Sequence, residues 1–300
     1  MRLLAALLLG SLCAFALPRL AAGDPALLAL LEAGQAADPA ALSRLRAAFG
    51  LDGTLPAQYL RWLGAALSGD FGISWRGGGA VGPELARRLA VSLSLGAAAL
   101  ALAACLALPL ARHAAARPGG LADRAIDAVA LLSQSLPTFW IGAVLLWWLA
   151  VGMGWGGLVA GNVPQRALLP LFLLSFAAFG PLSAVARAAW RATADSPHFQ
   201  AALARGEPPR RALARQGRRH ALASIAAAIA AEGAFAVGGA AVLEALCGVP
   251  GIGAWAVEAA RARDWPVLQA VLFTAILWCA AIQVAAGWAR RRLDPREAVL

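Results

Sequence analysis

Long apolar runs, most of them without a single charge, are the feature that most limits how this chain of 300 residues can fold. A helix needs about 20 consecutive apolar residues to cross the hydrocarbon core of a bilayer. Five segments meet this requirement, and among them only one charge occurs, Glu232. The five segments are residues 89–111, 128–151, 167–186, 221–243 and 265–289. The sequence therefore predicts an all-α polytopic membrane protein, a bundle of transmembrane helices.

The overall composition agrees with a membrane location. Hydrophobic residues make up 61% of the chain and charged residues only 14%, whereas a soluble domain carries about 25% charged residues. The formal net charge is +10, which could indicate binding to nucleic acid. Here, however, the arginines gather in segments predicted to lie on one side of a membrane, as the positive-inside rule expects. We therefore expect the lipid bilayer as a partner and no nucleic acid.

The first apolar segment, residues 3–22, allows two interpretations. It is shorter than most of the other five and is interrupted by Pro18 and Arg19. Arg2 followed by an apolar run also resembles a signal peptide, for which residues 21–23 could serve as the cleavage site. An uncleaved helix with its N-terminus inside makes the loops alternate consistently with the arginines. We prefer about six transmembrane helices with both termini inside, while cleavage would leave five.

The same pattern predicts four parts along the chain. Residues 1–22 form the first transmembrane helix, which resembles a signal sequence, and residues 23–88 form an external, periplasmic segment. Residues 89–289 form a five-helix transmembrane core with a cytoplasmic loop at 189–219, and residues 290–300 form a cytoplasmic tail. The external segment is too polar to span a membrane and is expected to fold into short helices. Those helices either pack on the membrane surface or receive a partner.

Several kinds of chemistry are not expected of this chain. No Cys-x-x-Cys pair occurs and the three histidines are scattered, so a metal site is not expected. The chain contains 26 arginines and no lysine. A phosphate-binding loop that ends in Gly-Lys-Ser/Thr therefore cannot be present. We expect no cofactor and no catalytic residues, and so no enzyme activity. The cysteines, interpreted as small apolar residues, are Cys13, Cys105, Cys247 and Cys279.

The loop at 189–219 carries a signal for a short helix. Ser196 is suited to cap a helix and Pro197 to occupy its first position. Residues 199–205 then follow a helical pattern, and Gly206 can adopt the left-handed conformation that ends a helix. Phe199, Ala201, Ala202 and Leu203 are expected to give this helix an apolar surface that requires a partner. The alternative is a solvated loop that contacts anionic lipids.

Ordered motifs along nearly the whole chain resemble the permease subunits of the oligopeptide, dipeptide and nickel ABC importers. Residues 55–63 resemble the external Gln-Tyr-x-x-Trp-Leu signature of that family, and residues 69–74 its Gly-Asp-x-Gly-x-Ser. Residues 135–140 resemble its Ser-Leu-Pro-x-Phe-Trp. Further matches are residues 23–26, Glu244, residues 250–253, residues 263–266 and the Leu-Asp-Pro-Arg at 293–296. The order and spacing of these motifs make the resemblance specific.

The resemblance implies a fold like that of type I ABC importer permeases and a role for the loop helix. In that family the helix ending in Gly is the coupling helix, or EAA motif, which docks on a cytoplasmic ATPase. The chain departs from the family pattern at Pro197, where an acid is usual nearby, at Ala228 in place of Pro, and at Glu232, where Gln is frequent. The residues implied to dock are Phe199, Gln200, Ala201, Ala202, Leu203, Ala204, Arg205, Gly206 and Glu207.

The resemblance also implies partners, location and cargo. It implies a second permease subunit, two cytoplasmic ATPase subunits that use ATP, and a periplasmic or lipid-anchored substrate-binding protein. The chain would lie in a bacterial inner membrane as a multi-pass, binding-protein-dependent transport protein. It would form half of a translocation pathway for peptides or for nickel and other metal chelates.

Five polar residues within the spans are candidates for the pathway. Glu232 is an acid inside a span, where ionisable groups are costly and usually face a cavity or a partner. It either lines the pathway and meets a cationic or amino group, pairs with a buried donor, or is held protonated. The other four either bond between helices or contact substrate: Ser133, Gln134, Ser135 and Thr138. Two rival functions are a proton-coupled secondary transporter that uses Glu232 and a membrane scaffold or sensor.

Overall fold

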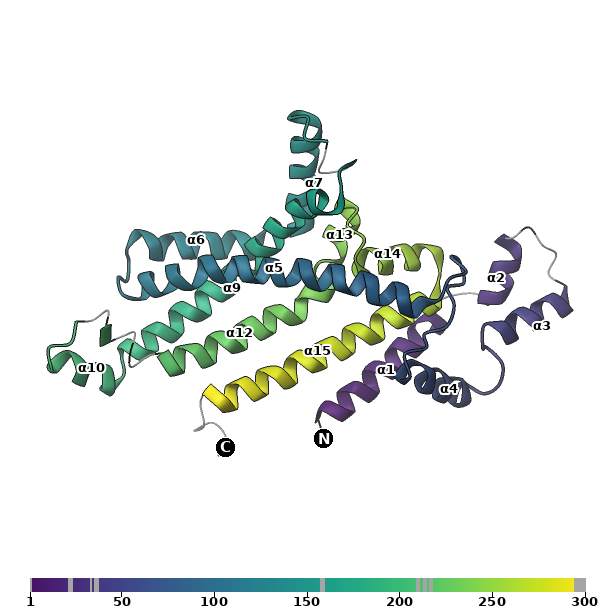
Figure 1. Cartoon of the computed structure of the whole chain (residues 1–300), viewed down its shortest axis with the longest axis horizontal. Helices are drawn as coiled ribbons and strands as arrows, with labels where there is room; N and C mark the ends of the chain where they lie inside the picture. The colour runs from purple at the N-terminus through teal and green to yellow at the C-terminus, as the bar shows by residue number, and fades with distance from the viewer. Residues whose placement is uncertain are drawn as a thin grey trace. The chain divides into compact units, whose positions relative to one another are not determined.

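The structure is a computed structural model and describes residues 2–20, 24–32, 34, 38–156, 160–208, 211–212, 215 and 218–293 (Figure 1). The elements in these ranges are helices, with one isolated antiparallel bridge between Ile73 and Ala80. The chain divides into two compact units, residues 1–88 with 255–277 and residues 89–254 with 278–300. The all-α prediction is confirmed for the described residues.

Unit 1 holds the first four helices, the start of α5, and parts of the last two helices. A hydrogen bond of 2.8 Å joins the hydroxyls of Ser11 and Tyr59, so α1 is fixed to α4. The Phe15 ring meets the Tyr59 ring edge to face with centroids 5.4 Å apart. The helices concerned are α1 (Arg2–Leu20), α2 (Pro25–Glu32), α3 (Pro39–Ala48), α4 (Leu55–Leu67), α5 (Val81–Ala115), α14 (Ile252–Ala262) and α15 (Trp265–Leu293).

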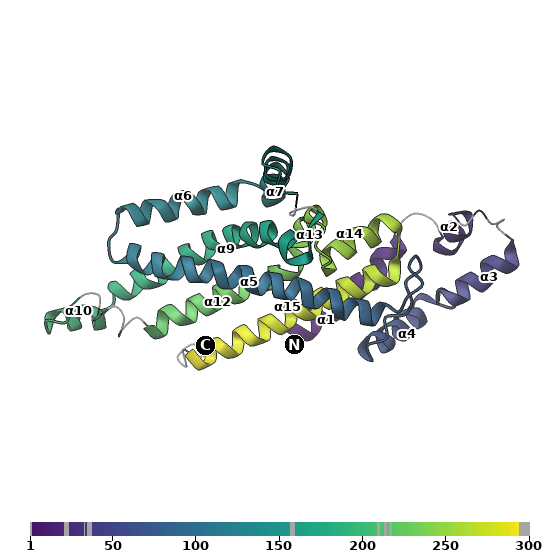
Figure 2. The ribbon, with the colours of Figure 1, turned by 45° about the horizontal axis from the view of Figure 1, so that its top comes forward.

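Unit 2 is a bundle built around α9 (Val163–Ala194) (Figures 1 and 2). This helix contacts its neighbours along its length, and a capping box formed by Asn162 and Gln165 fixes its start. Gly180 lets α9 approach α6, since a Cβ there would collide with the Ser133 side chain and the Ala130 backbone. Ala103 and Ala107 of α5 also pack with Ala178 and Leu182 of α9. The helices whose backbones lie closest to α9 are α6 (Leu121–Ser135), α7 (Thr138–Trp147), α10 (Pro197–Ala204), α12 (Arg218–Gly238) and α13 (Ala241–Cys247).

Three of the predicted spans are confirmed as long apolar helices. The runs at 89–111, 167–186 and 265–289 lie within α5, α9 and α15, which are long and apolar enough to cross a membrane. Pro109 in α5 and Pro170 and Pro181 in α9 are accommodated without ending the helix. Each of these helices continues by a turn or more beyond the apolar run.

The prediction of one continuous span at 128–151 is wrong. Helix α6 ends at Ser135, α7 begins at Thr138, and the two are bent by 90°; a π-helical turn, η1 (Trp148–Gly152), extends α7. The cause is Pro137, because a proline lacks an amide hydrogen and disfavours helical geometry in the residue before it. Leu136 accordingly adopts extended backbone angles, φ −101° and ψ 124°.

Two further runs form shorter helices than predicted. In the run at 221–243, α12 ends at Gly238 and α13 begins at Ala241, and the apolar part of α12 covers 221–234. The apolar part of α1 covers 3–17. The described chain thus has three helices that can cross a membrane, or five if each bent pair forms one span; the second bent pair is α13 with α14, at 83°.

The sidedness of the four predicted parts stays a prediction, as does the count of six spans. The proposed cleavage site at 21–23 lies outside the described residues, and so does most of the tail with its Leu-Asp-Pro-Arg motif at 293–296.

Candidate functional site

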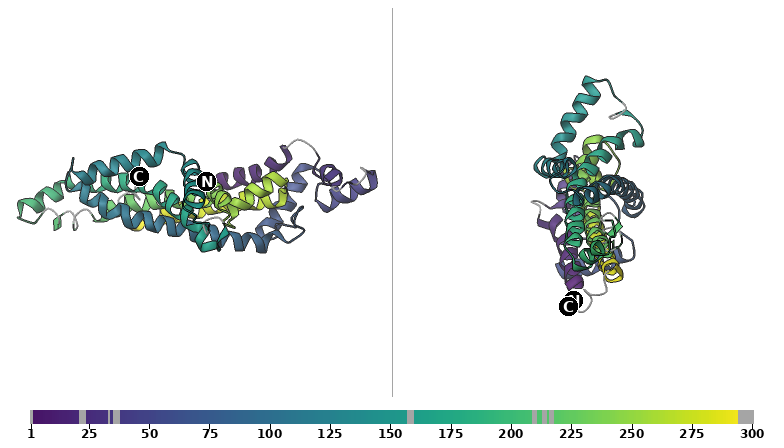
Figure 3. Two further views of the ribbon diagram at one scale, coloured as in Figure 1. Left: turned by 90° about the horizontal axis from the view of Figure 1, so that it is seen from above. Right: turned by 90° about the vertical axis from the view of Figure 1, so that its left-hand side faces the viewer.

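The predicted loop helix is present as α10, which spans Pro197–Ala204 at one end of unit 2 (Figure 3). Its N-cap is Ser196, whose hydroxyl accepts a hydrogen bond of 3.3 Å from the amide of Phe199. Pro197 takes the first helical position, where the missing amide hydrogen costs nothing. These are the residues from which the start of the helix was predicted.

The end of α10 is fixed by a left-handed turn at Gly206, which has φ +81°. The amide of Gly206 donates to the carbonyl of Leu203 at 2.9 Å, and the amide of Glu207 donates to Ala202 at 3.1 Å. This pair of bonds is the Schellman motif, which satisfies carbonyls that a helix end otherwise leaves free. Arg215 adds an ion pair to Glu207 at 3.2 Å. The helix is therefore rigidly terminated at both ends.

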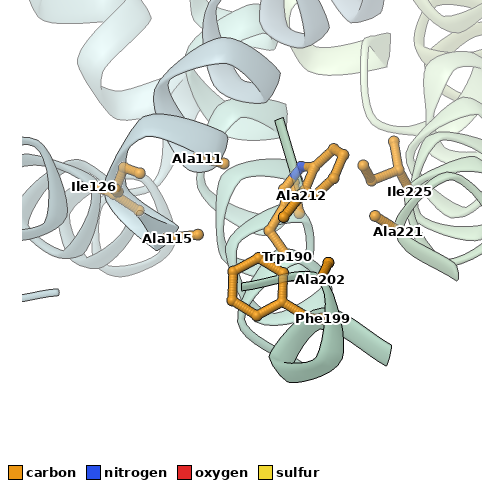
Figure 4. Packing of buried hydrophobic residues seen from close by; sticks show 11 residues of the cluster. Ala111, Ala115, Ile126, Trp190, Phe199, Ala202, Ala212, Ala221 and Ile225 are labelled. Carbon is orange, nitrogen blue, oxygen red and sulfur yellow. The ribbon is translucent and has the colours of Figure 1, made fainter. Parts of the chain in front are cut away.

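One face of α10 is anchored in the core of its own chain. Phe199 is 7% exposed and Ala202 is fully buried, and both belong to a cluster with Trp190 of α9 (Figure 4). The expectation that Phe199 and Ala202 offer an apolar surface to a partner is therefore wrong, because their side chains are used inside the chain. The face left to solvent consists of His198, Gln200, Ala201, Ala204 and Arg205.

An ionic cluster joins the start of α6 to the C-terminal end of α9, the end that is followed by α10. Asp123 accepts from Arg187 at 2.6 Å and from Arg191 at 2.7 Å, and the amide of Gly119 also donates to it, at 2.9 Å. Arg187 reaches Asp127 at 2.5 Å as well. Asp123 is 9% and Arg187 15% exposed at the side chain, whereas Asp127 is 62% exposed. Asp123 and Arg187 thus form the buried centre of the cluster, and Asp127 lies at its solvent-exposed edge.

Sequence reasoning missed this cluster, although a signal was present. Asp123 and Asp127 are four residues apart, and so are Arg187 and Arg191. Residues four apart share a face of a helix. Two acids on one helix face and two arginines on another are complementary, and both lie at the predicted cytoplasmic ends of their spans.

A cavity of about 300 Å³ in unit 2 brings together three of the five pathway candidates. Gln134, Thr138 and Glu232 line it, from α6, α7 and α12, together with small and apolar residues such as Gly96 and Ala99. The Glu232 carboxylate makes no hydrogen bond or ion pair with any described residue, so the predicted pairing with a buried donor is not observed. The cavity wall is therefore apolar except where these three polar side chains line it.

The other two pathway candidates do not line this cavity. Ser133 is buried, donates a hydrogen bond of 3.1 Å to the carbonyl of Ala130, and faces Gly180 of α9. It serves the contact between α6 and α9. Ser135 is the last residue of α6 and is exposed.

Comparison with known proteins shows the family to which the chain belongs. Residues 107–299, which include α10 and the cavity residues of α6, α7, α9 and α12, match the model of the binding-protein-dependent transport system inner membrane component. The chain belongs to this family. It is an inner-membrane, multi-pass permease subunit of a binding-protein-dependent ABC importer, which implies an ATPase and a substrate-binding protein as partners.

Curated relatives of the permease span nearly its whole length. A Sinorhizobium fredii protein with the name "probable peptide ABC transporter permease protein" is 29% identical over 94% of this chain and 92% of its own. The oligopeptide transport system permease of Bacillus subtilis is 28% identical over 97% and 95%. The glutathione transport system permease of Pectobacterium atrosepticum is 29% identical over 89% and 87%.

The permease also contains a fully buried acid, Glu244 of α13. Ser92 of α5 donates to its carboxylate at 2.6 Å, and the amides of Gly253 and Ala254 donate at 2.9 and 3.1 Å. The carboxylate thus caps the start of α14, where free amides favour an anion. Gly251 is required beside it, since a Cβ there would collide with the carboxylate.

Proposed function

We propose that this permease forms half of a peptide-import pathway and is driven by ATPase subunits that bind the exposed face of α10. The observation that carries the proposal is the division of α10 into two faces. Phe199 and Ala202 anchor one face in the core, and the opposite face, with Ala201 and Ala204, is free. A capped helix anchored in this way can transmit a push from a partner to the bundle.

The ionic cluster supplies the next step of the transmission. Because Arg187 and Arg191 bind Asp123, a displacement of α10 that moves the end of α9 also moves α6. The bend at Pro137 then separates α6 from α7, so that rigid helices can tilt about a fixed break. Tilting of such helices is a known way to alternate access to a site between two membrane sides.

The assembly we propose contains a second permease subunit, two cytoplasmic ATPase subunits, and a periplasmic or lipid-anchored substrate-binding protein. ATP is bound and hydrolysed by the ATPase subunits, and this chain contributes no catalytic residue. The family match supports a drive by ATP over the proton-coupled alternative.

Peptides are the cargo we propose, in preference to nickel or other metal chelates. The relatives described above are named for peptide, oligopeptide and glutathione transport, and glutathione is itself a tripeptide. The similarity to each of them covers most of both chains, so the comparison includes the helices that line the cavity.

The test is to reconstitute the complex and replace Ala201 by Glu on the exposed face of α10. We expect the ATPase subunits to be lost on purification and import of tri-alanine to cease, because a charge enters a face that a partner covers. Ala192→Glu is the matched control, since Ala192 is exposed on α9 outside the docking helix, and it should retain both. Full import by the Ala201→Glu complex would refute docking at this face, and import of nickel chelates without peptides would refute the cargo.

A further inference from the structure

The cavity lined by Gln134, Thr138 and Glu232 holds an acid that the chain itself leaves without a partner. Glu232 is half-buried, and no described residue donates a hydrogen bond to it or forms an ion pair with it. A carboxylate kept out of water without a partner is costly, and such groups in membrane helices usually meet a partner that arrives from elsewhere. A partner for the ionised form of Glu232 is a cation or a hydrogen-bond donor.

The neighbours of Glu232 limit what that partner can be. Gln134 brings an amide oxygen and Thr138 a hydroxyl oxygen. Together with the carboxylate of Glu232 they make three acceptor groups, each from a different helix. Among the described residues, no arginine or histidine lines the cavity. The described wall therefore favours a positive group: its one charged side chain is an acid, and its side-chain donors, the amide of Gln134 and the hydroxyl of Thr138, are neutral.

Helix α9 adds a fourth acceptor by a different route. Pro181 lines the cavity and has no amide hydrogen to give to the carbonyl of Ala177, four residues before it in the same helix. Ala177 lines the cavity too. A proline at this place removes one helical hydrogen bond and leaves the carbonyl of Ala177, a residue that lines the same cavity as Glu232, without its usual helical donor.

We propose that this cavity is a subsite for the ammonium group of a peptide in transit, with Glu232 as its specificity-determining residue. An ammonium group has three donors and one positive charge, which matches one carboxylate with additional neutral oxygens. Small lining residues, Gly96 and Ala99 of α5 and Gly239 after α12, leave room for the rest of the ligand. The proposal rests on the proposed function, since it assumes that peptides pass this point.

The experiment compares tri-alanine with N-acetyl-tri-alanine, which lacks the ammonium group, in the reconstituted complex. With Glu232→Gln we expect import of tri-alanine to fall about tenfold, the worth of a charge-assisted hydrogen bond, and import of the acetylated peptide to stay within about twofold. Glu232→Asp should recover most of the import. The matched control is Glu258→Gln, since Glu258 is exposed on α14 and lies outside the cavity.

A second measurement removes differences in the affinity of the binding protein by supplying it already saturated with one peptide or the other. Stimulation of ATP hydrolysis in the complex is recorded with the binding protein in each loaded state. The wild-type complex should respond to tri-alanine more than to the acetylated form, and Glu232→Gln should remove this difference. An equal loss for both peptides, or no loss for either, would overturn the subsite while leaving the proposed function intact. Failure of the wild-type complex to import tri-alanine, or import driven by a proton gradient without ATP, would overturn the proposed function itself.

Discussion

Two glutamates on consecutive helices, Glu232 of α12 and Glu244 of α13, occupy opposite kinds of site. Glu244 is fully buried and receives three hydrogen bonds from Ser92, Gly253 and Ala254. Glu232 lines a cavity and receives none from the described residues. Burial of an acid therefore does not reveal its role in this permease; the state of its hydrogen-bonding capacity does. A saturated carboxylate holds structure together, and an unsatisfied one is available to a ligand.

The largest expected effect is that of Glu244→Ala. The change leaves the hydroxyl of Ser92 and two amides at the start of α14 without their acceptor, and each unsatisfied buried group costs about 1–3 kcal/mol. We expect the free energy of unfolding in detergent to fall by about 3–5 kcal/mol, since a small cavity is added as well. Glu258→Ala, at an exposed position, should change it by under about 0.5 kcal/mol. A loss below about 1 kcal/mol in Glu244→Ala would show that these bonds do not stabilise the fold.

Gly251→Ala tests whether the Glu244 carboxylate packs against the backbone at residue 251. The added Cβ meets the carboxylate of Glu244, and such overpacking costs about 1–3 kcal/mol. In a Glu244→Ala background the same change should cost little, because the obstacle is gone, so the two effects are not additive. Gly287→Ala in α15 is the control, since a Cβ there meets nothing within 4 Å. Equal losses in both backgrounds, read from thermal unfolding curves, would contradict the contact.

Asp123 is an intermediate case, an acid that is saturated by charged partners. Asp123→Asn weakens its bonds to Arg187 and Arg191, so we expect a lower melting temperature and, in the assembled complex, ATP hydrolysis that no longer produces import. Asp127→Asn is the matched control, because Asp127 is 62% exposed and exposed ion pairs contribute little. Import per ATP hydrolysed is the measurement. The same ratio in both variants would remove the ionic cluster from the transmission path.

The two glutamates also show how far the sequence alone reaches. Apolar runs without charges predicted α5, α9 and α15, because hydrophobic length is a local property. Ser196, Pro197 and Gly206 predicted both ends of α10 for the same reason. Pro137 is also a sequence signal for a break between α6 and α7, since a proline restricts the residue before it. The uninterrupted hydrophobicity of residues 128–151 instead favours one continuous helix.

Most long-range pairing cannot be read from the sequence, and the complementary spacing of the acids and arginines in the ionic cluster is the exception. Glu244 and residues 250–253 were recognised as motifs without a role, because their partner Ser92 lies on α5, far away in the chain. Phe199 was expected to face a partner, although only the fold shows that Trp190 and its neighbours cover it. The five pathway candidates share only their polarity and their place in the predicted spans. The fold brings Gln134, Thr138 and Glu232 together at one cavity and leaves Ser133 and Ser135 outside it.

The smallest expected effect on stability is that of Glu232→Gln. No bond within the described chain is lost when the charge is removed, and the shape of the side chain is kept. We expect the free energy of unfolding to change by no more than about 0.5 kcal/mol, or to rise, because a carboxylate without a partner is itself unfavourable. Glu244→Gln is the paired measurement under the same conditions, and it should lose about 1–3 kcal/mol, since an amide group cannot replace both acceptor oxygens. If Glu232→Gln proves as damaging as Glu244→Gln, Glu232 supports the fold, and the distinction between a saturated and a ligand-binding acid fails for this permease. If only Glu244→Gln is damaging, loss of import in Glu232→Gln cannot be attributed to a damaged fold and must come from the substrate's path.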